Sequence, residues 1–221
     1  MKSLINYFKF VLFSLVLYGV STFAGSYDDF FRAIKRDDAK AVQALIQRGF
    51  DPNTLDPEAR HGLMLALSEA SLKVAEVLIE AKGTDLNFLS PHGESPLMYA
   101  ALKGHLALAA KLIDKQADVN KTGWTPLHYA ATGGHVELIR LLLEHHAFID
   151  AESPNGSTPL MMAAQYGSTG AVKMLLEEGA EPEQRNQHGF TPMDFARRGG
   201  RPDAQSLIEQ AISRKPSGRK R

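Results

Sequence analysis

The sequence predicts an all-α solenoid of stacked repeats, because one short phrase returns along the chain at nearly constant spacing. The proline of this phrase falls at residues 96, 126, 159 and 192, so the steps are 30, 33 and 33 residues. A fixed period of this length is the signature of a repeat architecture. A glycine also follows each proline after about eight residues. The four copies of the phrase are Glu94–Ala101, Trp124–Ala131, Ser157–Ala164 and Phe190–Arg197.

Each phrase predicts the start of a short helix that ends in a sharp turn. The hydroxyl of Thr or Ser can cap a free backbone N–H, and a proline at the first helical position has no N–H to leave unpaired. A second, more apolar helix should run back antiparallel, and an extended finger should lead to the next unit. We expect a left-handed turn at the glycine that ends each first helix, namely Gly104, Gly134, Gly167 and Gly200.

The phrase resembles the core of the ankyrin repeat, Thr-Pro-Leu-His-x-Ala-Ala, which Thr125–Ala131 match at every defined position. The resemblance implies a solenoid of helix–turn–helix units with extended fingers, about six units here with the caps included. It also implies a binding function, because ankyrin repeats usually hold partner proteins on their concave side. The residues used there are those of the fingertips and the exposed positions of each first helix.

We divide the predicted repeat domain, residues 25–213, into six units. Unit one lacks the Thr-Pro phrase and has a polar outer face, as a terminal cap that faces water requires. In unit two, His61 and Gly62 stand where other units have Thr and Pro. We expect a weaker helix start there, since glycine costs about 1 kcal/mol relative to a good helix former. The units span 27–53, 54–87, 88–120, 121–150, 151–183 and 184–213.

The finger of unit four is three residues shorter than that of unit three. Asn120 is three residues from Gly123, whereas the matching Asn87 is six residues from Gly93. We therefore expect a blunted fingertip that interrupts the row of fingers.

Residues 1–24 are predicted to be a signal peptide rather than part of the fold. Their apolar run, residues 10–20, has the length of a signal-peptide core and is short of the roughly 20 residues that span a bilayer. We expect cleavage after Ala24 or after Ser26, and an uncleaved N-terminal anchor is the alternative. In either case the repeats are exported. We expect them in the periplasm, and secretion is a further alternative. The resemblance is thus to an exported, bacterial type of ankyrin-repeat protein.

The formal net charge of zero hides an uneven distribution. All 25 Asp and Glu residues lie between residues 27 and 213, together with 18 of the 25 Lys and Arg residues, so this body carries a charge of −7. Residues 214–221 carry five basic groups, and we expect a disordered tail. The tail either improves solubility or weakly contacts an anionic membrane surface. We expect no nucleic-acid partner, and a monomer when the protein is free.

No motif for catalysis or cofactor binding is found in the sequence. The chain contains no cysteine, which excludes metal or nucleophile chemistry based on that residue. Histidines at zinc-ligand spacing, serine nucleophile elbows and phosphate-binding glycine loops are also missing. We therefore expect no enzyme activity, no metal and no cofactor. His105, His128 and His135 are expected to have structural roles within the repeats.

Surplus apolar side chains at the recognition positions are the candidate binding residues. Aromatic anchors of this kind often cost about 2 kcal/mol or more of binding energy when truncated. The alternative is that they only pack against the neighbouring finger. Tyr99 and Tyr129, by contrast, are expected to face inward and to belong to the core. The predicted protein-binding set is Trp124, Phe190, Tyr166, Leu89, His92, Asn155 and His188.

These observations favour an exported scaffold that binds a partner protein through the concave face of units three to six. One alternative is an inhibitor or immunity-type protein that blocks a toxin or hydrolase, for which the body of charge −7 could mimic an anionic substrate. Another alternative is an accessory protein that stabilises an envelope or redox enzyme.

Overall fold

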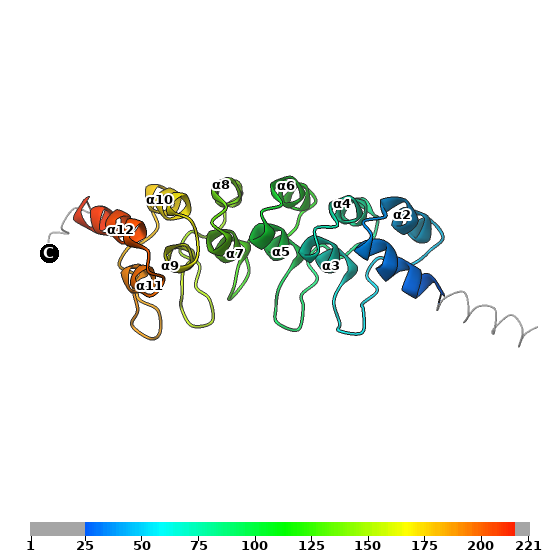
Figure 1. The fold of residues 1–221 in the computed structure, drawn as a ribbon, viewed down its shortest axis with the longest axis horizontal. Coiled ribbons are helices and arrows are strands. Elements are labelled where there is room, and N and C mark those ends of the chain that lie inside the picture. Colours follow the sequence, from blue (N-terminus) through cyan, green and yellow to red (C-terminus); the bar gives the residue numbers. More distant parts are fainter. Residues whose placement is uncertain (1–24, 215–221) are drawn as a thin grey trace, which may run out of the picture.

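The computed structural model describes residues 25–214, which form a row of helix pairs. Figure 1 shows the first helix of each pair beside the fingers, which project to one side, and the second helices along the opposite side. The described residues contain no β-strand, and Leu55 and His61 form an isolated bridge. The helix of residues 25–35 comes first, followed by α2 (Ala39–Gln47), α3 (Gly62–Ser68), α4 (Leu72–Glu80), α5 (Pro96–Lys103), α6 (Leu106–Asp114), α7 (Pro126–Gly133), α8 (Val136–Glu144), α9 (Pro159–Gln165), α10 (Thr169–Glu177), α11 (Pro192–Arg198) and α12 (Pro202–Arg214).

This arrangement confirms the predicted all-α repeat solenoid. The predicted signal peptide, residues 1–24, lies outside the described residues, as do residues 215–221 of the predicted tail. Arg214, which we assigned to the tail, is instead the last residue of α12.

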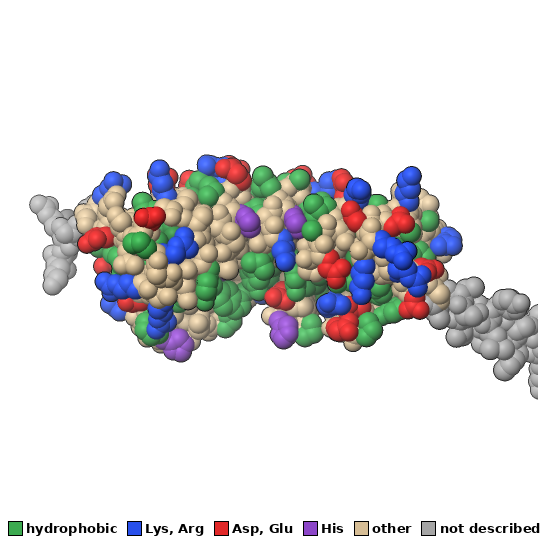
Figure 2. All heavy atoms as spheres, viewed as in Figure 1, with side chains coloured by type: hydrophobic (Ala, Val, Ile, Leu, Met, Phe, Trp, Pro, Cys, Tyr) green, Lys and Arg blue, Asp and Glu red, His purple; other side chains and the backbone are tan. Residues whose placement is uncertain are grey.

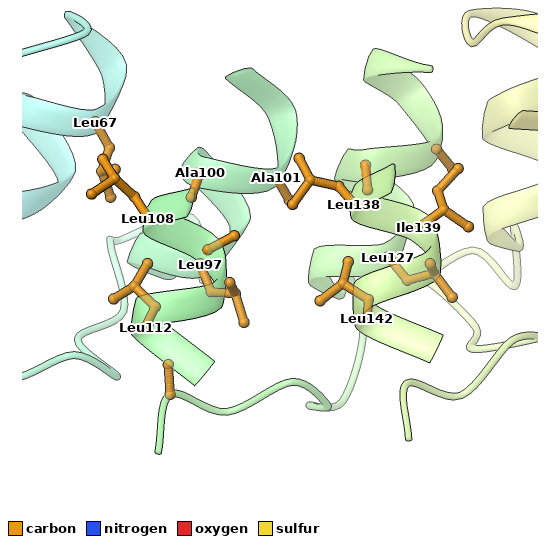
Figure 3. Close-up of a cluster of buried hydrophobic side chains, with 14 of the residues drawn as sticks. Leu67, Leu97, Ala100, Ala101, Leu108, Leu112, Leu127, Leu138, Ile139 and Leu142 are labelled. Atoms are coloured by element: carbon orange, nitrogen blue, oxygen red, sulfur yellow. The ribbon is translucent and has the colours of Figure 1, made fainter. Parts of the chain in front are cut away.

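The core is continuous along the row because each helix pair packs its apolar side chains against the next pair. Figure 3 shows leucine and alanine side chains of α5 to α8 that meet both within a unit and across the unit boundary. Leu97, Leu112, Leu127 and Leu142 are fully buried. Burial of this kind is the main source of stability in a repeat protein, whose units cannot cover their apolar faces alone.

The first helices from α5 onward begin as the phrase predicts. In α11, the Thr191 hydroxyl oxygen accepts a hydrogen bond from the Asp194 N–H at 3.3 Å, and the Asp194 carboxylate accepts one from the Thr191 N–H at 2.9 Å. This reciprocal capping box satisfies two of the N–H groups that a helix start leaves free. A similar reciprocal pair begins α5 and α9, where a methionine sulfur replaces the carboxylate as acceptor. At α7 the Thr125 N–H donates to Nδ1 of His128, and all three helices have proline at the first helical position.

An asparagine at the base of the finger ties each of three units to the next. Asn53 accepts a hydrogen bond from the Asp85 N–H at 2.7 Å and donates one to the Gly83 carbonyl at 2.8 Å. Asn87 and Asn120 make the same pair of bonds one unit further on. Between units four and five, Asp150 stands at the position of the asparagine. Its carboxylate accepts a hydrogen bond from the Glu181 N–H and cannot donate one. Burial raises the pKa of the Asp150 carboxyl above its usual value.

The expected left-handed turn is wrong for one of the four glycines. Gly104, Gly134 and Gly200 have positive φ, whereas Gly167 does not. A Cβ atom on Gly167 would lie 2.3 Å from the carbonyl oxygen of Ala131 in the preceding unit. The glycine is therefore required there by the close approach of two backbones and not by a left-handed conformation.

Gly62 begins α3, as the alignment of unit two predicts, but it is more than a weak helix start. A Cβ atom on Gly62 would lie 2.9 Å from Cε1 of Phe30 and 3.2 Å from Cδ1 of Ile34. Both of these side chains belong to unit one and are fully buried. The glycine thus lets the N-terminal cap sit close to α3.

His128 is fully buried and holds three groups in place. Its Nδ1 accepts hydrogen bonds from the Thr125 hydroxyl at 2.9 Å and the Thr125 N–H at 3.2 Å. Its Nε2 donates to the Ser157 carbonyl in the next unit at 2.9 Å. This pattern requires the neutral ring, because a protonated Nδ1 would face a donor. Burial lowers the pKa of His128 to about 4.

We expect the Gly62→Ala variant of the full-length chain to be less stable than the wild type. Overpacking against Phe30 should lower the free energy of unfolding in urea by about 1–3 kcal/mol. Helix propensity alone predicts the opposite sign, a gain of about 1 kcal/mol. The loss should shrink in a Phe30→Leu background, and a stabilised single variant would contradict the packing interpretation.

Acid should destabilise the protein through His128. Its folded pKa lies below the unfolded value, so the unfolded chain binds the proton first and stability falls as the pH drops from about 6.5 towards 4. The full effect of this residue is about 3 kcal/mol in the free energy of unfolding. Urea unfolding at several pH values should show a shallower pH dependence for His128→Gln. An equal pH dependence of the free energy of unfolding in the wild type and His128→Gln would contradict the assignment of this effect to His128.

Candidate functional site

The fingers and the first helices together form one side of the molecule, which we call the finger face. In four fingers, a backbone N–H donates to the carbonyl of the residue four positions later and closes the turn. The side chain of the first turn residue also accepts an N–H inside the turn, which rigidifies it. These turns are Asp56–Arg60, Ser90–Glu94, Ser153–Ser157 and Asn186–Phe190.

The finger of unit four is blunted, as its length predicts. The Nζ of Lys121 donates to the carbonyls of Thr122 at 3.0 Å and Trp124 at 3.3 Å, where the other fingers have a backbone turn. Figure 1 shows that this finger, which leads into α7, is shorter than its neighbours. In Figure 2, the outline of the molecule steps inward at the same place, between fingers three and five.

Trp124 and Phe190 are both half-buried, and each is held by a neighbour in its own unit. The Trp124 ring meets His128 edge-on, with ring centroids 5.2 Å apart and an angle of 76° between the planes. The Arg198 guanidinium carbon lies 3.6 Å from the centroid of the Phe190 ring. This cation–π contact covers one face of Phe190, so part of that side chain packs within its own unit, and not against the neighbouring finger as the alternative interpretation expects.

Tyr166 and Leu89 are the most open of the predicted anchors. Tyr166 is 57% exposed at the end of α9, and Leu89 is 49% exposed at the start of finger three. His92 and His188 are exposed in the turns of fingers three and six. These four residues present their side chains to solvent on the finger face.

Asn155 has a structural role that sequence reasoning missed. Its side-chain oxygen accepts from the Ser153 hydroxyl at 2.7 Å, inside the turn of finger five. Its backbone carbonyl accepts from the Gln187 N–H at 3.0 Å, and Asn186 donates to the Ser157 hydroxyl. Fingers five and six are therefore joined, which makes this half of the finger face stiffer than the gap at finger four.

The Glu94 carboxylate accepts hydrogen bonds from the hydroxyls of two tyrosines that are predicted to belong to the core. Tyr99 donates to its Oε2 at 3.0 Å, and Tyr129 of the next unit donates to its Oε1 at 3.2 Å. Both residues are half-buried, so they belong to the core only in part. Their hydroxyls reach the finger face, which was not predicted from the sequence. Burial and the Glu94 carboxylate raise the pKa of Tyr99 to about 12, and burial likewise raises the pKa of Tyr129. Both hydroxyls thus remain donors at neutral pH.

A cleft of about 220 Å³ lies beside this cluster, between fingers two and three. Its walls include Arg60, Met64, Pro91, Glu94 and Tyr99. Two larger hollows, of about 730 and 580 Å³, lie between α10 and α12 and between α2 and α4. The cleft is distinctive because it opens onto the finger face.

Phe148 is a further exposed aromatic side chain that sequence reasoning missed. It is 66% exposed, and its N–H donates to the Asn120 side chain at 2.9 Å. Units one, two, three and five have Asp51, Asp85, Asp118 and Glu181 in this place. A comparison of this position across the units would have shown one aromatic residue among four acids.

Over residues 25–214, no three His, Asp or Glu side chains gather into a cluster that could hold a metal ion. In the same part of the chain, no helix has both the length and the apolar character that crossing a membrane requires.

Comparison with known proteins agrees with this architecture. A family model described as ankyrin repeats (three copies) matches residues 30–122, 63–153, 114–186 and 146–215. Mouse ankyrin repeat and SAM domain-containing protein 6 is 32% identical over 78 residues, which are 34% of this chain and 9% of that protein. Human neurogenic locus notch homolog protein 2 is 35% identical over 82 residues, which are 37% of this chain and 3% of that protein. The chain thus spans less than a tenth of these curated relatives.

Among solved structures, the human ASB11 ankyrin repeat domain superimposes with a TM-score of 0.74 at 28% identity, and the match covers 82% of both chains. The family model alone covers well over half of the sequence. The chain therefore belongs to the ankyrin-repeat family, whose domain serves in general as a scaffold for protein–protein interaction.

Proposed function

We propose that this protein is an exported ankyrin-repeat scaffold that binds a partner protein through the finger face of units three to six. Trp124, Phe190, Tyr166 and Leu89 are the proposed anchors. Export rests on the signal-peptide pattern of residues 1–24, and the periplasm is the proposed location.

The observation that carries the binding proposal is the presence of exposed and half-buried large apolar side chains on this face. Leu89 and Tyr166 are about half exposed, whereas most large apolar side chains of the described residues are buried. His128 meets the Trp124 ring edge-on, and closed backbone turns hold fingers two, three, five and six. Anchors that are ordered before binding lose little entropy on association, which is why rigid aromatic residues dominate interface energies.

The short finger of unit four adds a shape argument. It leaves a step in the finger face between fingers three and five (Figures 1 and 2). Trp124 belongs to this short finger. A partner that fills this step would reach Trp124 and also Leu89, at the start of finger three. Tyr166, at the other end of α9 from finger five, would be contacted by a part of the partner that lies along the first helices.

Inhibition of an exported toxin or hydrolase is a second candidate, supported by the charge of −7 between residues 27 and 213. Such an inhibitor would depend on charge, so its binding should weaken strongly as salt rises. Binding through apolar anchors should depend little on salt.

The binding proposal predicts that Trp124 and Tyr166 are needed for capture of the partner. The full-length chain is expressed in its own host and cross-linked, and complexes are recovered from an osmotic-shock fraction. We expect the Trp124→Ala plus Tyr166→Ala variant to bind the recovered partner at least tenfold more weakly, since each anchor contributes about 2 kcal/mol.

Leu106→Ala is the matched control, because Leu106 is 42% exposed at the start of α6, among the second helices. This control should bind normally. Undiminished binding by the double variant would refute the assigned face, and recovery of the chain only from the cytoplasm would refute export.

A further inference from the structure

We propose that the cleft between fingers two and three receives a lysine or arginine side chain of the partner protein, with Glu94 as its counter-charge. This inference rests on the proposed function and specifies the chemistry of one contact.

The hydrogen bonds hold the Glu94 carboxylate in one position. Its Oε2 accepts from the Tyr99 hydroxyl at 3.0 Å and from the Ser90 hydroxyl at 3.2 Å, and its Oε1 accepts from Tyr129 at 3.2 Å. The side chain is half-buried and forms part of the cleft wall. A carboxylate held in this way needs no reordering to bind a cation, so little entropy is lost on binding.

No lysine, arginine or histidine of the described residues forms an ion pair with Glu94. The cation in the cleft, Arg60, is already paired with Asp56 at 2.6 Å and with Glu58 at 3.4 Å. Burial of Asp56, whose side chain is 4% exposed, makes the first pair a firm one. These four groups together leave two uncompensated negative charges at the cleft. The electrostatic complement is therefore a positive side chain.

The cleft volume suits a single side chain. About 220 Å³ is below the range of roughly 300–1,000 Å³ that is typical of small-molecule sites. Met64, Pro91 and the Tyr99 ring provide apolar wall along which the methylene stem of a lysine or arginine can lie. Its charged end would then reach Glu94.

Two other interpretations of the same residues give different expectations. An acidic residue of the partner that approached Arg60 would be repelled by Asp56 and Glu58, the two carboxylates already paired with it. If Glu94 only joined units three and four through the tyrosines, binding would not depend on its charge. A charge-specific experiment separates these cases from the proposal.

The experiment selects linear peptides from a display library on the full-length wild-type chain. We expect the selected peptides to share a lysine or arginine at one position, and to bind Glu94→Gln at least tenfold more weakly. Glutamine keeps an oxygen acceptor for one tyrosine hydroxyl, while the other hydroxyl would have to accept from its NH2 group, so thermal unfolding checks that the variant is folded. Glu144→Gln is the matched control, since Glu144 is exposed at the end of α8 and is not part of the cleft wall. It should change affinity less than threefold.

Tyr99→Phe provides a second test that does not alter the charge. It removes one hydroxyl bond to Glu94, so peptide affinity should change much less than in Glu94→Gln. Selected peptides without a basic consensus, or with an acidic one, would overturn the proposal, as would equal affinity for the wild type and Glu94→Gln. The proposed finger-face function fails separately, if the captured partner binds Trp124→Ala plus Tyr166→Ala undiminished. Loss of partner binding in that double variant, together with equal peptide affinity for the wild type and Glu94→Gln, would overturn only the role of Glu94.

Discussion

Side-chain hydrogen bonds from one repeat to the backbone of the next hold the whole solenoid in register. At the fingers, Asn53, Asn87 and Asn120 each bind a peptide group of the following unit. Between the helices, His105 and His135 donate through Nε2 to carbonyls of the preceding unit, those of Leu67 and Leu102. These bonds are directional, whereas apolar packing is not, so they fix the spacing at which the leucine and alanine layers meet.

The hydrogen bonds between units also explain where the chain tolerates a deletion within a repeat. Unit four loses three finger residues, yet Asn120 keeps both of its bonds because they lie at the base of the finger. Only the tip is shortened, and Lys121 supplies the donors that the missing turn would have provided. The irregularity is therefore confined to the exposed edge, where it shapes the finger face without weakening the stack.

Most of the fold was predictable from the sequence, because the repeated phrase specifies helix starts and inward residues locally. The contacts that were missed depend on the distance between units, which a local pattern does not contain. Gly167 illustrates this, since its constraint is the carbonyl of Ala131 in another unit. Gly62 is a second case, because its close neighbours lie in the N-terminal cap.

The candidate site was predictable only in outline. The recognition positions follow from the family pattern, and the exposed Leu89 and Tyr166 lie where that pattern places them. The Glu94 cluster was missed because the Tyr129 hydroxyl contacts Glu94 across a unit boundary. The half-buried Tyr129 ring made the residue resemble a core position. The structural role of Asn155 was missed because an unpaired amide in a turn and a hydrogen-bonded one are identical in sequence.

The central claim is that the partner binds the finger face and not the row of second helices. Hydrogen exchange of the full-length chain, measured with and without its captured partner, tests this claim directly. We predict slower exchange on binding in the turns of fingers three and five and in α5, α7 and α9, because contact there suppresses local opening. Slower exchange confined to α4, α6, α8 and α10, with the fingers unchanged, would contradict it.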